Sequence, residues 1–169
     1  FNVKGIGLVA IGYVQSGSIK VHDEVLLIPA NGQGSVKSLQ VMDDDVEQAK
    51  AGDRVGIALR NAEEASLSQG ALIVNNDGND TVEVHLKSEL NFISAPFTRY
   101  KPTAEGVIHV AIDLQFVVGR IEIVNEEKII VKWESPLMIR KHGSPRLLIC
   151  QLDAKPRIIG YAIDYKKLE

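Results

Sequence analysis

The chain has 169 residues, of which 45% are hydrophobic and 24% charged, and this composition excludes a disordered or fibrous protein. No apolar run approaches the ~20 residues that span a bilayer, and no signal-peptide pattern precedes the first predicted strand. We therefore expect a cytoplasmic protein without a membrane partner. The single cysteine, Cys150, lies in an apolar run. There the sequence predicts a buried, unreactive thiol with a raised pKa, and no disulfide.

Charge is distributed unevenly along the chain. Residues 1–78 carry 6 Lys or Arg against 10 Asp or Glu, and residues 79–169 carry 13 against 12. The stretch from Leu137 onward carries 7 basic residues against 3 acidic ones. A basic end is compatible with a phosphate-binding face, although a solvated β surface more often has the same composition. From charge alone, the candidate phosphate contacts are Arg140, Lys141, Lys166 and Lys167.

A hydrophobic period of two runs through nearly the whole chain and predicts an all-β fold. Residues 1–17 are studded with glycines, but they lack the third glycine and the following helix of a dinucleotide-binding loop. We interpret these glycines as bulges or barrel corners. The chain has no G-x-x-x-x-G-K-[ST] segment, so the sequence predicts no GTP-binding loop in it.

Residues 36–60 predict a strand, an acidic turn, a short helical turn at 46–50, a glycine turn and a second strand. The three aspartates at 43–45 lack the spaced ligands, central glycine and distal Glu of a calcium loop, so we expect a solvated turn. A second short helix is predicted at residues 62–67, capped by Asn61 and ended by Gly70.

A polar cluster at residues 75–80 is the densest break in the pattern. It predicts a boundary between two β-barrels, at residues 1–75 and 80–169. Strand-forming segments follow in the second half, and Gly119 and Pro136 are among the residues expected to separate them.

The histidines and the other reactive side chains suggest no catalytic or metal site. The four histidines lack the spacing of a zinc site, and no Ser/His/Asp or Cys/His set can be argued. His85 and His109 fall in alternating strands, where we expect them to face solvent. The sequence therefore predicts no catalytic residue and no metal ligand.

Three segments together resemble domain two of EF-Tu-like translational GTPases. They are the opening F-x-V-x-G-x-G-x-V-x-x-G-x-V-x-x-G, the V-K-S-L-Q at 36–40 and the A-G-D-R-V-G-I-A-L-R at 51–60. Residues 38–47 are closer to the SelB-like branch, including its archaeal members. The strand order at 135–161 is similar to the third domain of the same family. The resemblance implies two consecutive small β-barrels, a domain-two barrel followed by a barrel like the EF-Tu C-terminal domain.

The resemblance implies a role in translation elongation through aminoacyl-tRNA binding. In the family, domain two holds the charged 3′ end and domain three meets the acceptor and T arms of the tRNA. By family position, the 3′-end pocket is lined by Phe1, Gln40, Asp43 and Arg54. The implied partners are aminoacyl-tRNA, the ribosome and an intramolecular GTPase domain, with no DNA. The resemblance implies no enzymatic activity in this chain, because GTP and magnesium are expected only in an N-terminal GTPase domain.

Two pocket positions depart from the family. EF-Tu has an acidic residue where this chain has Gln40 and a basic residue where it has Asp43, so an anion replaces a cation near a ligand phosphate or carboxylate. Three alternatives stay open. One is a pair of protein-interaction barrels that no longer bind tRNA, and another is the equivalent region of an initiation-factor gamma subunit. The third is a flavin-reductase-like enzyme barrel, which the absence of a flavin motif disfavours.

Overall fold

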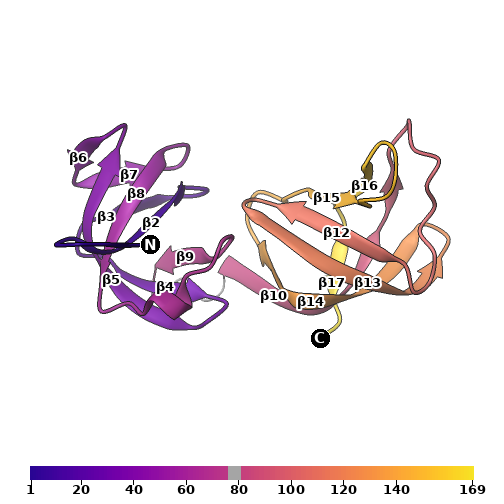
Figure 1. Ribbon diagram of the computed structural model, residues 1–169, viewed down its shortest axis with the longest axis horizontal. Helices are drawn as coiled ribbons and strands as arrows, with labels where there is room; N and C mark the ends of the chain where they lie inside the picture. The colour runs from indigo at the N-terminus through magenta and orange to yellow at the C-terminus, as the bar shows by residue number, and fades with distance from the viewer. Residues whose placement is uncertain (76–80) are drawn as a thin grey trace. The chain divides into compact units, whose positions relative to one another are not determined.

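The computed structural model describes residues 1–75 and 81–169, and it consists almost entirely of β-strands (Figure 1). The chain divides into two compact units, unit 1 at Phe1–Thr81 and unit 2 at Val82–Glu169. The predicted fold class, two consecutive small β-barrels, is confirmed. The polar cluster that motivated the predicted boundary lies, apart from Asn75, outside the described residues. Within the described ranges, no helix combines the length and hydropathy that crossing a membrane requires.

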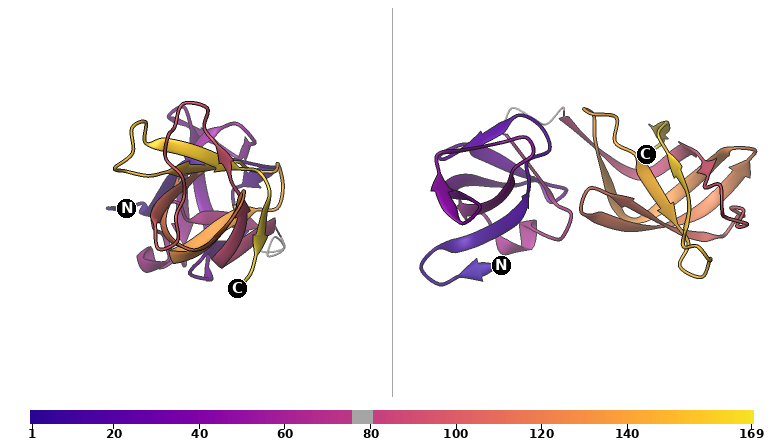
Figure 2. Two further views of the ribbon diagram at one scale, coloured as in Figure 1. Left: turned by 90° about the vertical axis from the view of Figure 1, so that its right-hand side faces the viewer. Right: turned by 90° about the horizontal axis from the view of Figure 1, so that it is seen from above.

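Unit 1 is built around one curled antiparallel sheet. Its elements are β1 (Asn2–Val3), β2 (Gly7–Tyr13), β3 (Ser18–Lys20), β4 (Glu24–Ile28), β5 (Gly32–Val41), β6 (Asp44–Val46), β7 (Gln48–Lys50), β8 (Arg54–Arg60), the 3-10 helix η1 (Glu64–Ser66) and β9 (Leu72–Asn75). The main sheet has the order β1-β2-β8-β5-β4-β9, with β6 paired to β5, and β3 pairs with β7 separately. Figure 2 shows how these strands wrap around a common interior.

Alternate residues of the long strands of unit 1 fill its core. Leu39 on β5 and Val55, Ile57 and Leu59 on β8 are buried in one cluster together with Leu27 of β4. Burying a side chain of this size stabilises the fold by about 1.5–3 kcal/mol. Because side chains alternate along a strand, the residues between these positions face outward. This alternation creates the outer surface described below.

The glycines near the amino end act as the sequence predicts. Gly5 and Gly7 have φ values of +84° and +105°, in the turn that connects β1 to β2 and at the first residue of β2. These conformations lie where a β-carbon would be strained. The glycines therefore allow the sharp reversal of the chain, and they form no nucleotide loop.

The predicted helical turn at residues 46–50 is wrong, because this segment forms β6 and β7. Ala49 is completely buried and pairs with Ile19 of β3, and this packing favours an extended chain over a helix. The second predicted helix is partly right. Only Glu64–Ser66 form a 3-10 turn, and Asn61 does not cap it, because the N-cap is Glu63 without a side-chain hydrogen bond.

Unit 2 contains a second curled antiparallel sheet. Its strands are β10 (Val82–Asn91), β11 (Ile93–Ser94), β12 (Val107–Ile112), β13 (Gln115–Asn125), β14 (Lys128–Arg140), β15 (Leu147–Cys150), β16 (Ile158–Ala162) and β17 (Tyr165–Lys167). The sheet order is β11-β16-β15-β12-β13-β14-β10-β17. Its inward residues form one cluster, which includes the completely buried Ile108, Ile121 and Ile149.

Two residues expected to separate strands lie inside strands instead. Gly119 is in the middle of β13, where a β-carbon would come within 2.6 Å of the Trp133 ring, so glycine leaves room for the indole. Pro136 lies in β14, between Lys132 and Leu137, where the pairing with β10 is interrupted. Proline is tolerated there because no ladder hydrogen bond needs its missing N–H.

Candidate nucleic-acid interface

The side of unit 1 that faces away from its core presents apolar and polar groups together. On three neighbouring strands, Ile11 pairs with Gly56, and Gly56 pairs with Gln40. Tyr13 pairs with Arg54 one step further along the same strands. Residues directly opposite each other in an antiparallel sheet share a face, so all five lie on one surface. We call this surface of β2, β8 and β5 the outer face of unit 1.

Three of the predicted pocket residues lie together at one end of this face. Gln40 donates a hydrogen bond from Nε2 to Asp45 Oδ1 at 3.0 Å, which leaves its carbonyl oxygen free to accept. Asp43 and Met42 form the two-residue turn between β5 and β6, with φ values of +67° and +53°, as a type I′ turn requires. Arg54 is exposed, and it has no ion pair within the described part of the chain.

Phe1 lies on the same face but apart from the other three. Its ammonium group donates to the Val9 carbonyl at 3.0 Å and its carbonyl accepts from the Val9 N–H at 2.9 Å, so the two residues are paired. Val9 alternates with Ile11 on β2 and pairs with Ala58 on β8. The Phe1 side chain is 61% exposed, and β2 and β8 lie between it and the strand that carries Gln40.

In unit 2, the predicted phosphate contact Arg140 already has an anionic partner. Its Nε and Nη2 donate to the two carboxylate oxygens of Asp113 at 2.9 and 3.0 Å, which is a bidentate ion pair. Arg140 and Lys141 also line an open pocket of about 280 Å³ together with Glu83 and Asp164. The surroundings of Arg140 are thus mixed in charge, and a phosphate would have to compete with Asp113.

The predicted contacts Lys166 and Lys167 point to opposite sides of the sheet. They are consecutive residues of β17, and Lys166 pairs with Glu89 while Lys167 pairs with Ser88. Ser88 is completely buried on the inner side, whereas Glu89 lies on the outer side and pairs with Lys128 at 2.9 Å. Because strand side chains alternate, the two lysines cannot contact one flat ligand together.

The structure reveals a basic surface that charge counting along the sequence misses. Arg120 of β13 pairs with Lys132 of β14, and Lys132 pairs with Lys87 of β10. These three side chains, which we call the cationic row, are directly opposite one another, an arrangement that is unfavourable unless an anion lies near. Glu122 supplies one at 2.7 Å from Lys87. Lys132 has no side-chain partner in the described ranges.

Two features connect the cationic row to its surroundings. Glu89, the partner of Lys166, is two residues beyond Lys87 on β10, so Lys166 lies on the same face as the row. Arg120 donates from Nη1 to the Glu105 carbonyl at 3.4 Å, at the end of the connection between β11 and β12. The signal that could have found the row is the alternation of basic and apolar residues in each strand. The pairing between strands was needed to place the three side chains together.

The connection between β11 and β12 exposes an aromatic side chain among cations. Phe97 is 85% exposed, and Arg99 and Lys101, at alternate positions, are also exposed. The intervening Tyr100 packs against the core and donates its backbone N–H to Thr98 Oγ1 at 3.1 Å. The loop is therefore anchored while its aromatic and basic side chains project into solvent.

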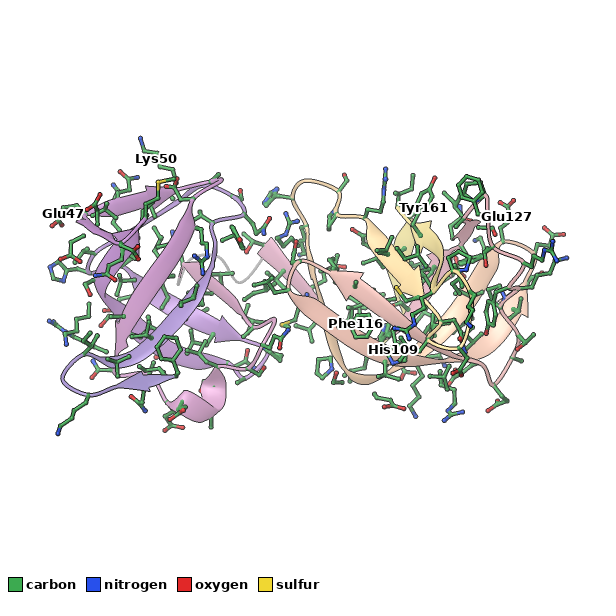
Figure 3. All side chains as sticks on the ribbon, turned by 45° about the horizontal axis from the view of Figure 1, so that its top comes forward. Glu47, Lys50, His109, Phe116, Glu127 and Tyr161 are labelled. Atoms are coloured by element: carbon green, nitrogen blue, oxygen red, sulfur yellow. The ribbon has the colours of Figure 1, made fainter. Side chains whose placement is uncertain are left out.

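The two histidines that were expected to face solvent are at least partly buried. His109 is half-buried, and its ring stacks on Phe116 of the next strand with centroids 5.0 Å apart, as the labelled residues in Figure 3 show. His85 is completely buried, so the prediction for it is wrong. The predicted alternation is interrupted by an irregularity in the pairing with β14 between His85 and Lys87, so Leu86 is exposed while His85 is inward, where its hydrogen bonds compensate for burial.

The prediction for Cys150 is confirmed. The thiol is free and buried, and burial raises its pKa above the ordinary value. Within the described ranges, no group of three or more His, Cys, Asp or Glu side chains could hold a metal ion.

Comparison with known sequences shows which proteins this chain resembles. The family model for elongation factor Tu domain 2 matches residues 7–74. An uncharacterized protein of Methanocaldococcus jannaschii is 32% identical over 95% of this chain and 50% of its own length. The selenocysteine-specific elongation factor of the same organism is 29% identical over 94% of this chain and 33% of its own length. The chain thus spans half or less of these two relatives.

Solved structures have the same fold across both units. The apo form of elongation factor SelB from Methanococcus maripaludis matches 96% of this chain and 40% of its own, with a TM-score of 0.76 and 23% identity. A bacterial selenocysteine-specific factor, EF-Sec, matches 99% of this chain and 26% of its own, with a TM-score of 0.77 and 20% identity. Residues 7–74 therefore match the second domain of elongation factor Tu, and the whole chain is similar in sequence and fold to part of the SelB-like elongation factors.

Proposed function

We propose that this chain binds aminoacyl-tRNA, with the 3′ end on the outer face of unit 1 and the sugar–phosphate backbone on the cationic row of unit 2. The observation that carries the proposal is the outer face itself, where Gln40 presents a free amide oxygen and Arg54 a guanidinium group without an ion pair among the described residues, while Phe1 presents an aromatic ring elsewhere on the same face. These are the groups that recognise an unpaired nucleotide by stacking, base-edge hydrogen bonding and phosphate pairing.

On unit 1, each group has a distinct chemical role. The exposed ring of Phe1 stacks on a base, an interaction worth about 1–3 kcal/mol per base. Gln40 accepts through Oε1, because its Nε2 is held by Asp45, so a ribose hydroxyl or an exocyclic amine suits it. The guanidinium group of Arg54 pairs with a phosphate. Asp43 disfavours an anionic aminoacyl group nearby and favours a neutral or cationic one.

On unit 2, the backbone contacts are Arg120, Lys132 and Lys166 on the face of the cationic row, with Arg99 and Lys101 on the anchored loop. Of the residues proposed from charge alone, this set keeps Lys166 and leaves out Arg140 and Lys167. Arg140 is neutralised by Asp113, and Lys167 points to the other side of the sheet. Lys141 stays a candidate at the pocket that it lines.

The chain contributes binding rather than catalysis in this proposal. GTP, magnesium and GTP hydrolysis belong to a GTPase domain of the same factor, which is an intramolecular partner, and the ribosome is the larger one. The proposed setting is the cytoplasm. These assignments follow from the similarity to these elongation factors.

A titration of the 169-residue chain with aminoacyl-tRNA at several salt concentrations tests the proposal. Phosphate contacts release counterions, so we expect weak binding whose logarithm falls linearly with the logarithm of salt. The double variant R120Q/K132Q should reduce the slope by roughly 2, because each substitution removes one cation that pairs with a phosphate. Lys20→Gln, in unit 1, is the matched control and should leave the slope unchanged. Salt-independent binding, or none, would contradict the proposal.

A docking surface for a protein is the second candidate function, and the acidic turn favours it. Asp43, Asp44 and Asp45 are all exposed beside the outer face. Asp45 accepts a hydrogen bond from the side-chain amide of Gln40. An anionic edge next to exposed Ile11 and Tyr13 suits a partner with basic and apolar side chains. The variant Asp43→Arg distinguishes the two functions. Increased protection of the aminoacyl ester against hydrolysis would support a tRNA pocket, and no change would support docking.

A further inference from the structure

A buried hydrogen-bond network surrounds His85 in unit 2. Its Nδ1 lies 2.8 Å from Ser88 Oγ, and its Nε2 lies 3.1 Å from Glu83 Oε2. Trp133 donates from Nε1 to the same Ser88 hydroxyl at 2.9 Å. His85 and Ser88 are completely buried, whereas the Glu83 side chain is 43% exposed and lines the pocket that contains Arg140. Glu83 therefore connects the buried imidazole to the protein surface.

The network fixes the tautomer of His85. The ionised Glu83 carboxylate can only accept, so His85 donates to it from Nε2. The unprotonated Nδ1 accepts the hydrogen of the Ser88 hydroxyl, whose oxygen accepts from the indole N–H of Trp133. Every polar atom of the ring has one partner in this neutral form. A second ring proton would face the Ser88 hydroxyl, which would have to turn its hydrogen away into the apolar interior.

The C-terminal segment lies directly on this network. Residues 165–169, which we call the latch, pair with β10 through Ser88–Lys167 and Leu90–Tyr165. The carbonyl of Glu169 accepts from the backbone N–H groups of Leu86 and Lys87 at 3.1 and 3.4 Å. The Tyr165 ring meets the His85 ring edge-on, with centroids 6.4 Å apart. The latch is an edge strand, so β10 is its only neighbour in the sheet order of the described residues.

We propose that His85 is a proton-sensitive switch that holds the latch on β10 when neutral and releases it when protonated. Protonation places a charge inside unit 2 beside Lys167 of the latch, and the two cations repel each other. Among the other charged or titratable groups near the ring, Glu83 is on the same strand and attracts the charge, and Tyr165 is on the latch. On β14, Arg140 is already paired with Asp113.

The direction of the pH effect follows from the burial of His85. Burial lowers the pKa of His85 below the ordinary value of 6.5. The hydrogen bond and the charge of Glu83 raise this pKa but only partly offset the effect of burial, and the charge of Lys167 lowers it further. A group with a depressed folded-state pKa that must stay neutral stabilises the closed form fully above the unfolded-state value. That stability is lost as pH falls below about 6.5. Release would also remove Lys166 from the face of the cationic row.

Hydrogen exchange of the backbone amides, measured on the 169-residue chain between pH 7.5 and 5.5, tests the switch. After correction for intrinsic exchange, opening of the latch should increase at pH 5.5, one unit below the unfolded-state pKa, by up to about tenfold. The amides of β12 and β13 should stay more strongly protected than those of the latch at both pH values, because they exchange only through unfolding of the whole unit. Lys167→Met should reduce the increase, because it removes the like charge without touching the imidazole. His142→Gln, an exposed histidine, is the control and should behave as the wild type.

Three outcomes would overturn the proposal. Equal protection of the latch at both pH values would show that no release occurs. Protection of the latch no lower than that of β12 and β13 at either pH would show global unfolding instead of a local opening. An NMR titration in which His85 becomes protonated while residues 165–169 stay protected would separate the imidazole from the latch. The variant His85→Gln, if folded, should abolish the pH dependence. These results do not depend on whether the chain binds tRNA.

Discussion

The two units use the same architecture but keep their polar groups in different places. Unit 1 leaves Gln40, Asp43 and Arg54 exposed on the outer face, with only one side-chain hydrogen bond among them. Unit 2 keeps several polar groups paired or buried, including the Arg140–Asp113 pair and the network around His85. A surface with unpaired groups is suited to an external ligand, whereas paired and buried groups specify a fold. In the proposed function, recognition of the tRNA end therefore falls to unit 1.

The largest expected effect concerns the buried groups of unit 2. Trp133→Ala removes the indole that packs over Gly119 and the donor to Ser88, and it should destabilise unit 2 by about 3–5 kcal/mol. Urea denaturation followed by amide exchange should show the loss in β10 and β14, while β2 and β8 of unit 1 keep their protection. An equal loss in unit 1 would contradict independent cores.

The variant Phe1→Ala tests the exposed groups on the outer face of unit 1. Removal of the ring should weaken binding of tRNA by about 1–3 kcal/mol, because base stacking is lost. The salt slope should not change, since no charge is removed. Fluorescence titration at three salt concentrations measures both quantities. A reduced slope would mean that the variant disturbs the protein more widely than the stacking site.

Acid should affect the units differently. Because the pKa of His85 is lowered by burial, unit 2 should lose up to about 1.4 kcal/mol of stability per pH unit below about 6.5. Thermal unfolding monitored through Trp133 at pH 7.5, 6.0 and 5.0 should show this loss. His85→Gln, although less stable at neutral pH, should have a flatter pH dependence in unit 2. If the stability of that variant has the same pH dependence as the wild type, His85 is not the cause of the dependence.

The smallest expected effect concerns the surface. Lys128→Ala breaks the exposed 2.9 Å pair with Glu89 and should change the stability of unit 2 very little, because solvent screens the pair. Chemical denaturation in low and high salt should give nearly the same value for variant and wild type. A larger loss of stability would mean that exposed ion pairs stabilise unit 2 more than their exposure to solvent suggests.

The sequence predicts the fold well because the period of two marks every long strand and the resemblance supplies the order. It fails where packing decides the local structure. Residues 46–50 have a composition that allows a helix, but burial of Ala49 against Ile19 requires an extended chain. Gly119 has the composition of a turn, yet it is needed under the Trp133 ring. Neither neighbour is close in sequence.

The sequence predicted some residues of the candidate site and missed others, for a similar reason. The unit 1 residues could be proposed from family positions, because the matching motifs are continuous in sequence. The cationic row could not, because Lys87, Arg120 and Lys132 are distant in sequence and only strand pairing places them side by side. Charge counting selected Arg140 and Lys167 instead, since it takes no account of the Asp113 pair or of strand alternation.

The most direct test compares binding of intact tRNA with binding of the same tRNA lacking its 3′-terminal adenosine. If the outer face of unit 1 holds that nucleotide, its removal should weaken binding to the wild-type chain by about 1–3 kcal/mol, the value of one stacked base. The same removal should have no effect on the Phe1→Ala variant. Equal affinity of the wild-type chain for both tRNAs would contradict the proposed site.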